Sequence, residues 1–227
     1  QRQVEHRALE APVELLERTA LAGPHAGKQG VGHVDGEAGA GARFGRQLED
    51  AAQRPEELAR VVLVGHSYAG LLITAVADRY PERIVRLVYL DAIVPQPGES
   101  WSSTHSAERV AERLAAGATT GGLSFAPPDA AVFGLQGADR DWVNRRQTPQ
   151  PMRVYQAPLD FDAQRVARVP RTFIDCTAPA LPTIAVSRER VRSEPGWRVL
   201  ELEAGHDPMV SAPEALAKLL LDVARGQ

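Results

Sequence analysis

The sequence predicts an α/β fold in which helices cover a mostly parallel, doubly wound sheet. From Pro55 onward, short apolar runs alternate with helical patterns, and this alternation is typical of parallel strands connected by helices. The runs are apolar along their whole length, as expected for strands covered on both faces. The length supports one such core, because 227 residues with an apolar fraction of 44% suffice for a single globular domain.

The regular part of the sequence gives each expected element a local signal. Residues 61–64 are apolar and β-branched, as in a buried strand. The following helix is expected to end at Tyr80 and Pro81, because proline cannot continue a helix. Ser211 and Glu214 have the spacing of a capping box at the start of the last helix. The expected strands are 61–64, 84–90, 172–176 and 197–202, and the expected helices are 68–79, one from about 182, and 213–224.

Residues 96–168 lack strand signals, and we expect them to form a helical lid inserted between two strands of the sheet. Within this segment, residues 106–116 have an amphipathic pattern that places Val110 and other apolar residues on one face, with Gly117 as the expected stop. Repeated prolines interrupt the rest. The core domain is therefore expected at 56–227, with the lid inserted into it.

Residues 1–55 form an atypical segment, because they are rich in glycine and alanine and contain no strand-like run. The glycine spacing in residues 27–45 fits neither a phosphate loop nor a dinucleotide-binding turn, so we expect no nucleotide site. The composition changes abruptly at about Pro55. We hypothesise that this front is translated from a shifted frame or a misassembled start. Sequencing the source transcript tests this, and an in-frame reading through Gln1 would contradict it.

Charge and composition exclude several classes of function. The formal net charge of -3 and the pI near 6.1 leave no basic surface for nucleic acid and no polybasic segment for an anionic membrane. No cluster of His, Cys or carboxylates has metal-ligand spacing, so we expect no metal. Cys176 is the only cysteine, which rules out an intramolecular disulfide and is compatible with a reducing compartment. With no apolar run of about 18 residues that could span a membrane, we expect a cytoplasmic protein.

The sharpest chemical signal is the segment VVLVGHSYAG, which places Ser67 between an apolar strand and a helix. Gly65 and Ala69 flank the serine with the spacing of a nucleophile elbow, a strained turn that exposes the hydroxyl above the sheet edge. The backbone N–H of Tyr68 would then face the developing oxyanion. His66 is expected to pack beside the site. The alternative is a capping serine at an ordinary strand-to-helix turn.

A serine nucleophile needs a base, and His206 lies where this chain order places one, on a loop between the last strand and the last helix. The alternative for His206 is a surface-loop histidine without a catalytic role. The other histidines outside the elbow lie in the atypical front or at the start of the lid helix, and we expect no catalytic role for them. They are His6, His25, His33 and His105.

Two carboxylates compete for the role of the acid that orients His206. Asp91 directly follows the second expected strand, so its carboxylate is expected at the same sheet edge as Ser67. Asp175, inside a later strand, is the alternative. We favour Asp91, whose own alternative role is to cap the start of the lid. Asp207 adjoins the base and would struggle to turn back onto its ring.

With these motifs, residues 56–225 resemble the esterase branch of the α/β-hydrolase superfamily that includes the plant methylesterases and hydroxynitrile lyases. The matching pieces are VVLVGHSYAG, RLVYLDAIVPQPGES, RQTPQP, RTFIDCTAP and GWRVLELEAGHDPMVSAPEAL. The resemblance implies an eight-stranded α/β-hydrolase core, a lid over a small apolar acyl pocket, no cofactor, and triad roles for Ser67 and His206. The acid role extends to Asp91 by analogy with members that place it after this strand. In the plant-like branch the acid would follow Cys176, where this sequence has none.

The expected activity is hydrolysis of a small carboxylic ester through an acyl-enzyme on Ser67. Residues 1–55 lack the His-Gly pair that supplies a second oxyanion donor in such proteins, which puts the activity in question if this segment is genuine. Two alternatives stay open, namely cyanohydrin cleavage by the same triad and a non-catalytic ligand-binding protein. The expected partner is a small-molecule ester, and a homodimer is left open. The residues expected to line the pocket, or otherwise to pack the lid itself, are Trp101, Phe125, Phe133, Trp142 and Tyr155, with His66 beside them.

Overall fold

The computed structural model describes residues 60–226. The predictions for residues 1–55, including the absence of a first strand, lie outside this range. Within it, strands and helices alternate in the predicted order, from Val61 to Arg225.

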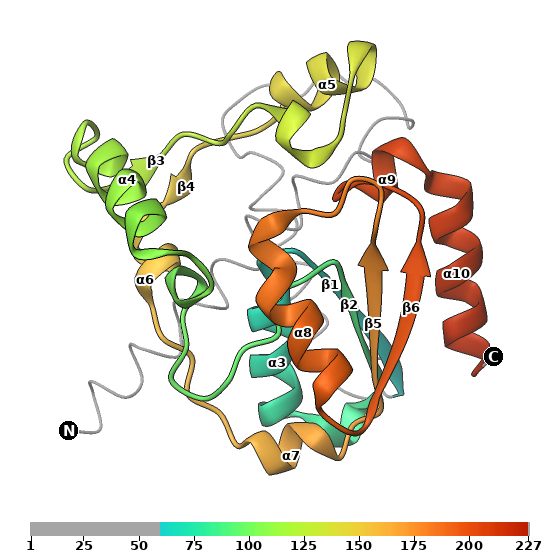
Figure 1. Cartoon of the computed structure of the whole chain (residues 1–227). Helices are drawn as coiled ribbons and strands as arrows, with labels where there is room; N and C mark the ends of the chain where they lie inside the picture. The colour runs from blue at the N-terminus through green and yellow to red at the C-terminus, as the bar shows by residue number, and fades with distance from the viewer. Residues whose placement is uncertain (1–59, 227) are drawn as a thin grey trace, which may run out of the picture. The chain divides into compact units, whose positions relative to one another are not determined.

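The described residues form a parallel sheet with the strand order β1-β2-β5-β6 (Figure 1). Its strands are β1 (Val61–His66), β2 (Ile84–Leu90), β5 (Arg171–Cys176) and β6 (Trp197–Leu202). His66 at the end of β1 pairs with Leu90 at the end of β2, and Ile174 of β5 pairs with the same leucine. Side chains that follow these strand ends therefore gather at one edge of the sheet.

Helices cover both faces of this sheet. On one face, α3 (Ala69–Arg79) and α8 (Ala185–Ser193) share an apolar cluster with Leu87 of β2. On the other face, α10 (Pro213–Arg225) shares a second cluster with Val88 (Figure 1). Adjacent strand residues point to opposite faces, so a strand covered on both sides is apolar throughout. The predicted α/β class with a mostly parallel, doubly wound sheet is confirmed.

Several boundaries differ slightly from the predicted ones. The first strand extends to His66, and the third begins at Arg171. A 3-10 turn, η2 (Pro81–Arg83), follows α3, and another, η5 (Pro182–Ile184), precedes α8. Both turns begin with proline, whose fixed backbone angle suits the first residue of a helical turn. None of the helices in residues 60–226 has the length and apolar character needed to cross a bilayer.

The capping box predicted from Ser211 and Glu214 is wrong. Ser211 ends a separate short helix, α9 (Pro208–Ser211), and its hydroxyl bonds to a carbonyl in that helix's own turn. The last helix begins at Pro213 behind Ala212, which has no side chain able to cap it. Proline needs no N–H partner at this position, so it starts the helix without a capping box.

Between β2 and β5 the chain forms a run of short elements (Figure 1). They are η3 (Trp101–Thr104), α4 (Ala107–Ala118), β3 (Ser124–Phe125), η4 (Ala130–Phe133), α5 (Gly137–Asn144), β4 (Gln150–Pro151), α6 (Met152–Gln156) and α7 (Ala163–Ala167). The segment also contains a small sheet that its sequence does not signal, because β3 and β4 pair antiparallel. A strand of two residues is too short to leave a periodic signal in the sequence. The role of this segment as a lid stays a prediction.

The expected helix stop at Gly117 is also wrong. The helix starts as expected, because the Ser106 side chain accepts a hydrogen bond from the Arg109 N–H, but it continues to Ala118. A Cβ atom at position 117 would lie 2.1 Å from the terminal methyl of Met152. Gly117 therefore allows α6 to pack against α4 and does not end the helix.

Candidate active site

The turn between β1 and α3 has the backbone geometry of a nucleophile elbow. Ser67 has a φ of 55°, in the left-handed region that side-chain-bearing residues rarely adopt. Two backbone hydrogen bonds hold it there, from Ser67 N–H to Leu90 O at 3.2 Å and from Ile93 N–H to Ser67 O at 3.0 Å. The elbow is thus anchored to the end of β2. A strained residue of this kind persists only where the surroundings fix it, and such residues cluster at functional sites.

Close backbone approaches explain the small residues around Ser67. A Cβ atom at Gly65 would lie 2.7 Å from Ala69 O and 2.9 Å from Ile73 Cγ2. At Gly70 the approach is closer still, because a Cβ atom would lie 1.9 Å from Ile93 O. The first turn of α3 therefore packs directly on the chain that leaves β2.

Replacing Gly70 by alanine is expected to lower the free energy of unfolding by about 3 kcal/mol or more, because the clash is with a backbone carbonyl and no side chain can move aside. Thermal or urea unfolding measures this loss. Gly117→Ala is the matched control, since its Cβ meets only the flexible end of Met152 and alanine favours a helix. Equal stabilities of the two variants would contradict the close packing at Gly70.

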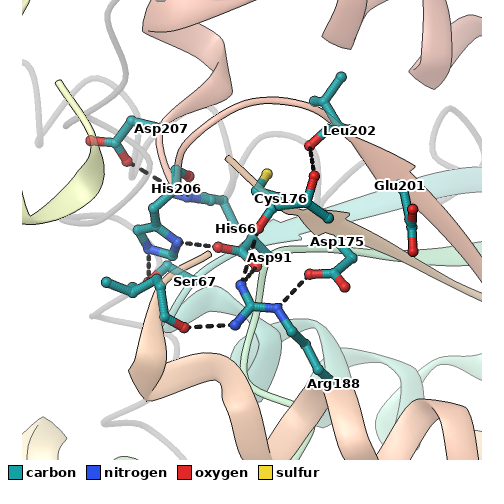
Figure 2. A network of polar contacts seen from close by, with 12 residues as sticks. His66, Ser67, Asp91, Asp175, Cys176, Arg188, Glu201, Leu202, His206 and Asp207 are labelled. Carbon is teal, nitrogen blue, oxygen red and sulfur yellow. Dashed lines mark hydrogen bonds and ion pairs between the residues drawn. The ribbon is translucent and has the colours of Figure 1, made fainter. Parts of the chain in front are cut away.

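Three side chains from three strand ends form a connected chain of hydrogen bonds (Figure 2). His206 Nε2 lies 2.9 Å from Ser67 Oγ, and His206 Nδ1 lies 2.6 Å from Asp91 Oδ2. A carboxylate only accepts, so Nδ1 carries the proton and Nε2 is free to accept from the serine hydroxyl. Asp91 is 0% exposed and His206 is 2% exposed. This is the arrangement of a nucleophile, a base and an orienting acid.

The structure brings Asp91, and not Asp175, to the histidine. Asp91 follows β2 with a φ of 39°, and its N–H bonds to Ile174 O at 2.8 Å. The Asp175 carboxylate instead binds Arg188 and Arg192. Both acids lie near the same edge of the sheet. Asp175 lies inside β5, whereas Asp91 follows the end of β2 and contacts the His206 ring.

The backbone of the histidine loop contacts the segment between β2 and β5. His206 N–H donates to Phe133 O at 3.1 Å, and the two rings have centroids 5.3 Å apart. A Cβ atom at Gly205 would lie 2.4 Å from the same carbonyl oxygen. Phe133, expected in the substrate pocket, therefore also holds the backbone of His206.

A comparison with protein families agrees with this geometry, since residues 24–219 match the family described as the alpha/beta hydrolase family. The chain belongs to the alpha/beta hydrolase family. The match extends upstream of residue 56, where the resemblance in the sequence motifs begins.

This alpha/beta hydrolase is similar to the carbendazim hydrolyzing esterase of Nocardioides sp. (strain SG-4G), with 36% identity over 173 residues that cover 73% of this chain and 72% of that protein. It is also similar to Methylesterase 7 of Arabidopsis thaliana, with 25% identity over 181 residues covering 73% and 69%. A solved extracellular alpha/beta-hydrolase from a Paenibacillus species, described as sharing structural and functional homology with tobacco salicylic acid binding protein 2, superposes with a TM-score of 0.68 at 21% identity over 78% of this chain and 76% of that one. The resemblance to the methylesterase branch is confirmed, and the solved structure shows the shared fold.

His66 contacts the backbone of His206. Its Nε2–H donates to His206 O at 2.7 Å, and Asp207 Oδ1 lies 3.7 Å from the same nitrogen. Burial, followed by the nearby charge of His206, lowers the pKa of His66 to about 3. Burial also raises the pKa of Asp207. The Asp207 carboxylate lies near His66. From the sequence, Asp207, next to His206 in the chain, was expected to be unable to turn back onto the His206 ring.

The unfolding free energy is expected to fall as the pH drops from 6.5 toward 3, because the unfolded state then binds a proton on His66 that the folded state excludes. The slope is less than about 1.4 kcal/mol per pH unit, since the side chain is 28% exposed and keeps part of its hydration. Urea unfolding of His66→Gln, which keeps a donor for His206 O, is expected to give a flatter profile. Parallel profiles for the two proteins would contradict the assignment. The raised pKa of Asp207 acts in the opposite direction in both proteins.

The aromatic residues expected to line a pocket, or otherwise to pack the lid, form a packed cluster around Trp101. Its ring centroid lies 5.3 Å from those of Tyr68 and Tyr155 and 5.8 Å from that of Phe125. These rings join the elbow to η3, β3 and α6. Trp142 of α5 is not brought to this cluster in the described structure, because its ring packs against Arg146, which follows that helix. The prediction that it lines the same pocket is therefore not supported by its position.

Two polar residues that contact this aromatic cluster were not anticipated from the sequence. Arg113 places its guanidinium carbon 4.8 Å from the ring centroid of Phe125 and 5.4 Å from that of Tyr155. His105 Nδ1 lies 2.8 Å from Tyr155 Oη. The helical spacing offered a signal for the arginine, since residue 113 follows Val110 by three positions and shares its inward face.

The site also contains a potential oxyanion donor. Tyr68 precedes α3, and within residues 60–226 its backbone N–H has no hydrogen-bond acceptor. An N–H at a helix start suits a developing negative charge. A second donor was expected to be missing from residues 1–55, which lie outside the described range.

One group in the described part of the chain has the composition of a metal site, namely His66, His206 and Asp207, whose ligand atoms lie within 4.8 Å of one another. Both ring nitrogens of His206 already bind Ser67 and Asp91. This leaves it no lone pair for a metal while the hydrogen-bonded chain is intact. The absence of a metal stays a prediction.

Proposed function

We propose that this alpha/beta hydrolase is a carboxylic ester hydrolase that works through an acyl-enzyme on Ser67. The single observation that carries this is the hydrogen-bonded chain from Ser67 Oγ through His206 to Asp91, at 2.9 Å and 2.6 Å. Its similarity to a carbendazim hydrolyzing esterase and to a methylesterase supports the reaction class.

The reaction follows from the tautomer that Asp91 imposes. His206 Nε2 takes the proton of Ser67 Oγ as the oxygen bonds to the ester carbonyl carbon, and the Tyr68 N–H stabilises the oxyanion. The histidine then gives this proton to the departing alcohol as the ester C–O bond breaks. Water, deprotonated by the same nitrogen, attacks the acyl-enzyme, and the carboxylic acid leaves as Ser67 regains its proton.

We propose a small ester with an apolar or aromatic part as the substrate. Trp101 contacts Tyr68 of the elbow, Phe125 and Tyr155 pack against Trp101, and Phe133 lies beside His206. Such rings bind flat apolar groups by stacking and exclusion of water. We propose no cofactor for this reaction.

We further propose that the protein acts in the cytoplasm, either alone or as a homodimer. Cys176 is buried, and burial raises the pKa of its thiol to about 12, so it is suited to a structural and not a redox role. The similar Paenibacillus hydrolase is described as extracellular, so fractionation of the native source is the direct test. Sedimentation of the purified chain tests the homodimer.

Labelling of the intact chain with a fluorophosphonate probe tests the function. We expect covalent labelling that peptide mass spectrometry locates at Ser67, and loss of labelling after heat denaturation. No labelling of a chain that melts cooperatively would overturn the proposal in favour of a non-catalytic ligand-binding protein. Release of acid from an ester, compared with release of cyanide and aldehyde from a cyanohydrin, separates ester hydrolysis from lyase activity.

A further inference from the structure

Arg188 of α8 lies between the two acids that compete for the catalytic role (Figure 2). Its Nη2 donates to Asp91 Oδ1 at 2.6 Å, and its Nε donates to Asp175 Oδ1. The side chain is only 11% exposed. The guanidinium group therefore links the catalytic acid to a second carboxylate inside the protein.

Backbone contacts fix the guanidinium group at the end of β5. Arg188 Nη1 donates to Leu181 O at 2.7 Å, and Nη2 lies 3.3 Å from Cys176 O. The loop that leaves β5, residues 177–180, contains no carboxylate. The Arg188 cation thus lies at the end of β5, after which the plant-like branch is expected to place its acid. Here the cation instead contacts Asp91, which follows β2.

The two oxygens of Asp91 have different partners. Oδ2 accepts from His206 Nδ1, while Oδ1 accepts from Arg188 Nη2. Rotation of the carboxylate would break both bonds, and because Asp91 is 0% exposed, solvent cannot replace them. Arg188 therefore holds the acid in the orientation that the base needs.

The charges of this network alternate. Asp91 and Asp175 are buried carboxylates, Arg188 lies between them, and Arg192, 43% exposed, binds Asp175 from the solvent side at 2.5 Å. Without Arg188, the two carboxylates would face each other with no cation between them to offset their repulsion.

We propose that Arg188 is a positioning residue of the hydrolase, which orients the Asp91 carboxylate for His206. This role rests on the proposed function of the triad. Arg188 touches neither Ser67 nor His206 in the described hydrogen bonds and acts through Asp91.

The test compares Arg188→Met with Arg192→Met in the full chain, using hydrolysis of a p-nitrophenyl ester and the rate of fluorophosphonate labelling. Both variants remove a cation from Asp175, but only the first removes one from Asp91. Arg188→Met is expected to lower kcat by about a hundred-fold with little change in KM, and Arg192→Met by less than about five-fold. Arg188→Lys keeps the charge but cannot span both acids, so its kcat is expected to lie between those of the two methionine variants. It replaces Arg188→Met in the comparison if Arg188→Met does not fold.

A double-mutant cycle separates positioning from a merely structural role. In an Asp91→Asn background, loss of Arg188 is expected to cause no further loss of kcat, whereas a structural defect would multiply with it. Equal activities of Arg188→Met and Arg192→Met in an active enzyme would overturn the inference while leaving the proposed function intact. A wild-type chain with neither turnover nor labelling would overturn both.

Discussion

Replacing Ser67 by alanine is expected to lower kcat for ester hydrolysis by about a million-fold. Alanine has no nucleophilic atom, and without the Oγ atom His206 Nε2 has no serine proton to accept. The fold should persist, because the hydrogen bonds that anchor the elbow to Leu90 and Ile93 come from the backbone of residue 67. We therefore expect an unchanged melting temperature together with lost turnover and lost fluorophosphonate labelling.

Ser193→Ala is the matched control, since this exposed serine bonds only to a carbonyl in α8. Its kcat and labelling are expected to equal those of the wild type. Turnover of Ser67→Ala within about ten-fold of the wild type would rule out the acyl-enzyme mechanism, because loss of the nucleophile in a serine hydrolase is far more costly than this.

The elbow and the base could be predicted because their signals are local or follow from chain order. The sequence alone shows the apolar run of β1 and the small residues around Ser67. It also shows that His206 lies between the last expected strand and the last expected helix. Asp91 could be proposed because parallel strands end at one edge, so a residue following β2 lies near one following β1. The structure was needed to show that Asp175 does not contact His206, since this acid also lies near the end of an apolar strand.

Other features depend on contacts between distant residues and leave no local signal. Arg188 is separated by 97 positions from Asp91, and nothing in the sequence of α8 marks this arginine among its neighbours. The carbonyl of Phe133 that binds the His206 N–H is also distant in sequence from the histidine. The sequence pattern also misled at the start of the last helix. The spacing of Ser211 and Glu214 resembles a capping box, but the helix begins at Pro213 without a side-chain cap.

Asp91→Asn is expected to lower kcat by about ten-thousand-fold, because the histidine would adopt the wrong tautomer. Arg188 Nη2 needs an acceptor and would bind the amide oxygen, so the amide NH2 would face His206 Nδ1. The ring must then accept on Nδ1 and carry its proton on Nε2, facing Ser67 Oγ, where it cannot take the serine proton. Steady-state kinetics and thermal melting measure the two effects separately.

Asp175→Asn is the matched control for Asp91→Asn, since both replace a buried carboxylate that binds Arg188. It is expected to lower stability, because Arg188 and Arg192 lose a charged partner, but to keep kcat within about ten-fold of the wild type. The reverse pattern, with Asp175→Asn nearly inactive and Asp91→Asn active, would assign the acid to β5. Comparable losses of kcat in both variants would mean that the acids act as one unit through Arg188, because only that side chain binds both in the described structure.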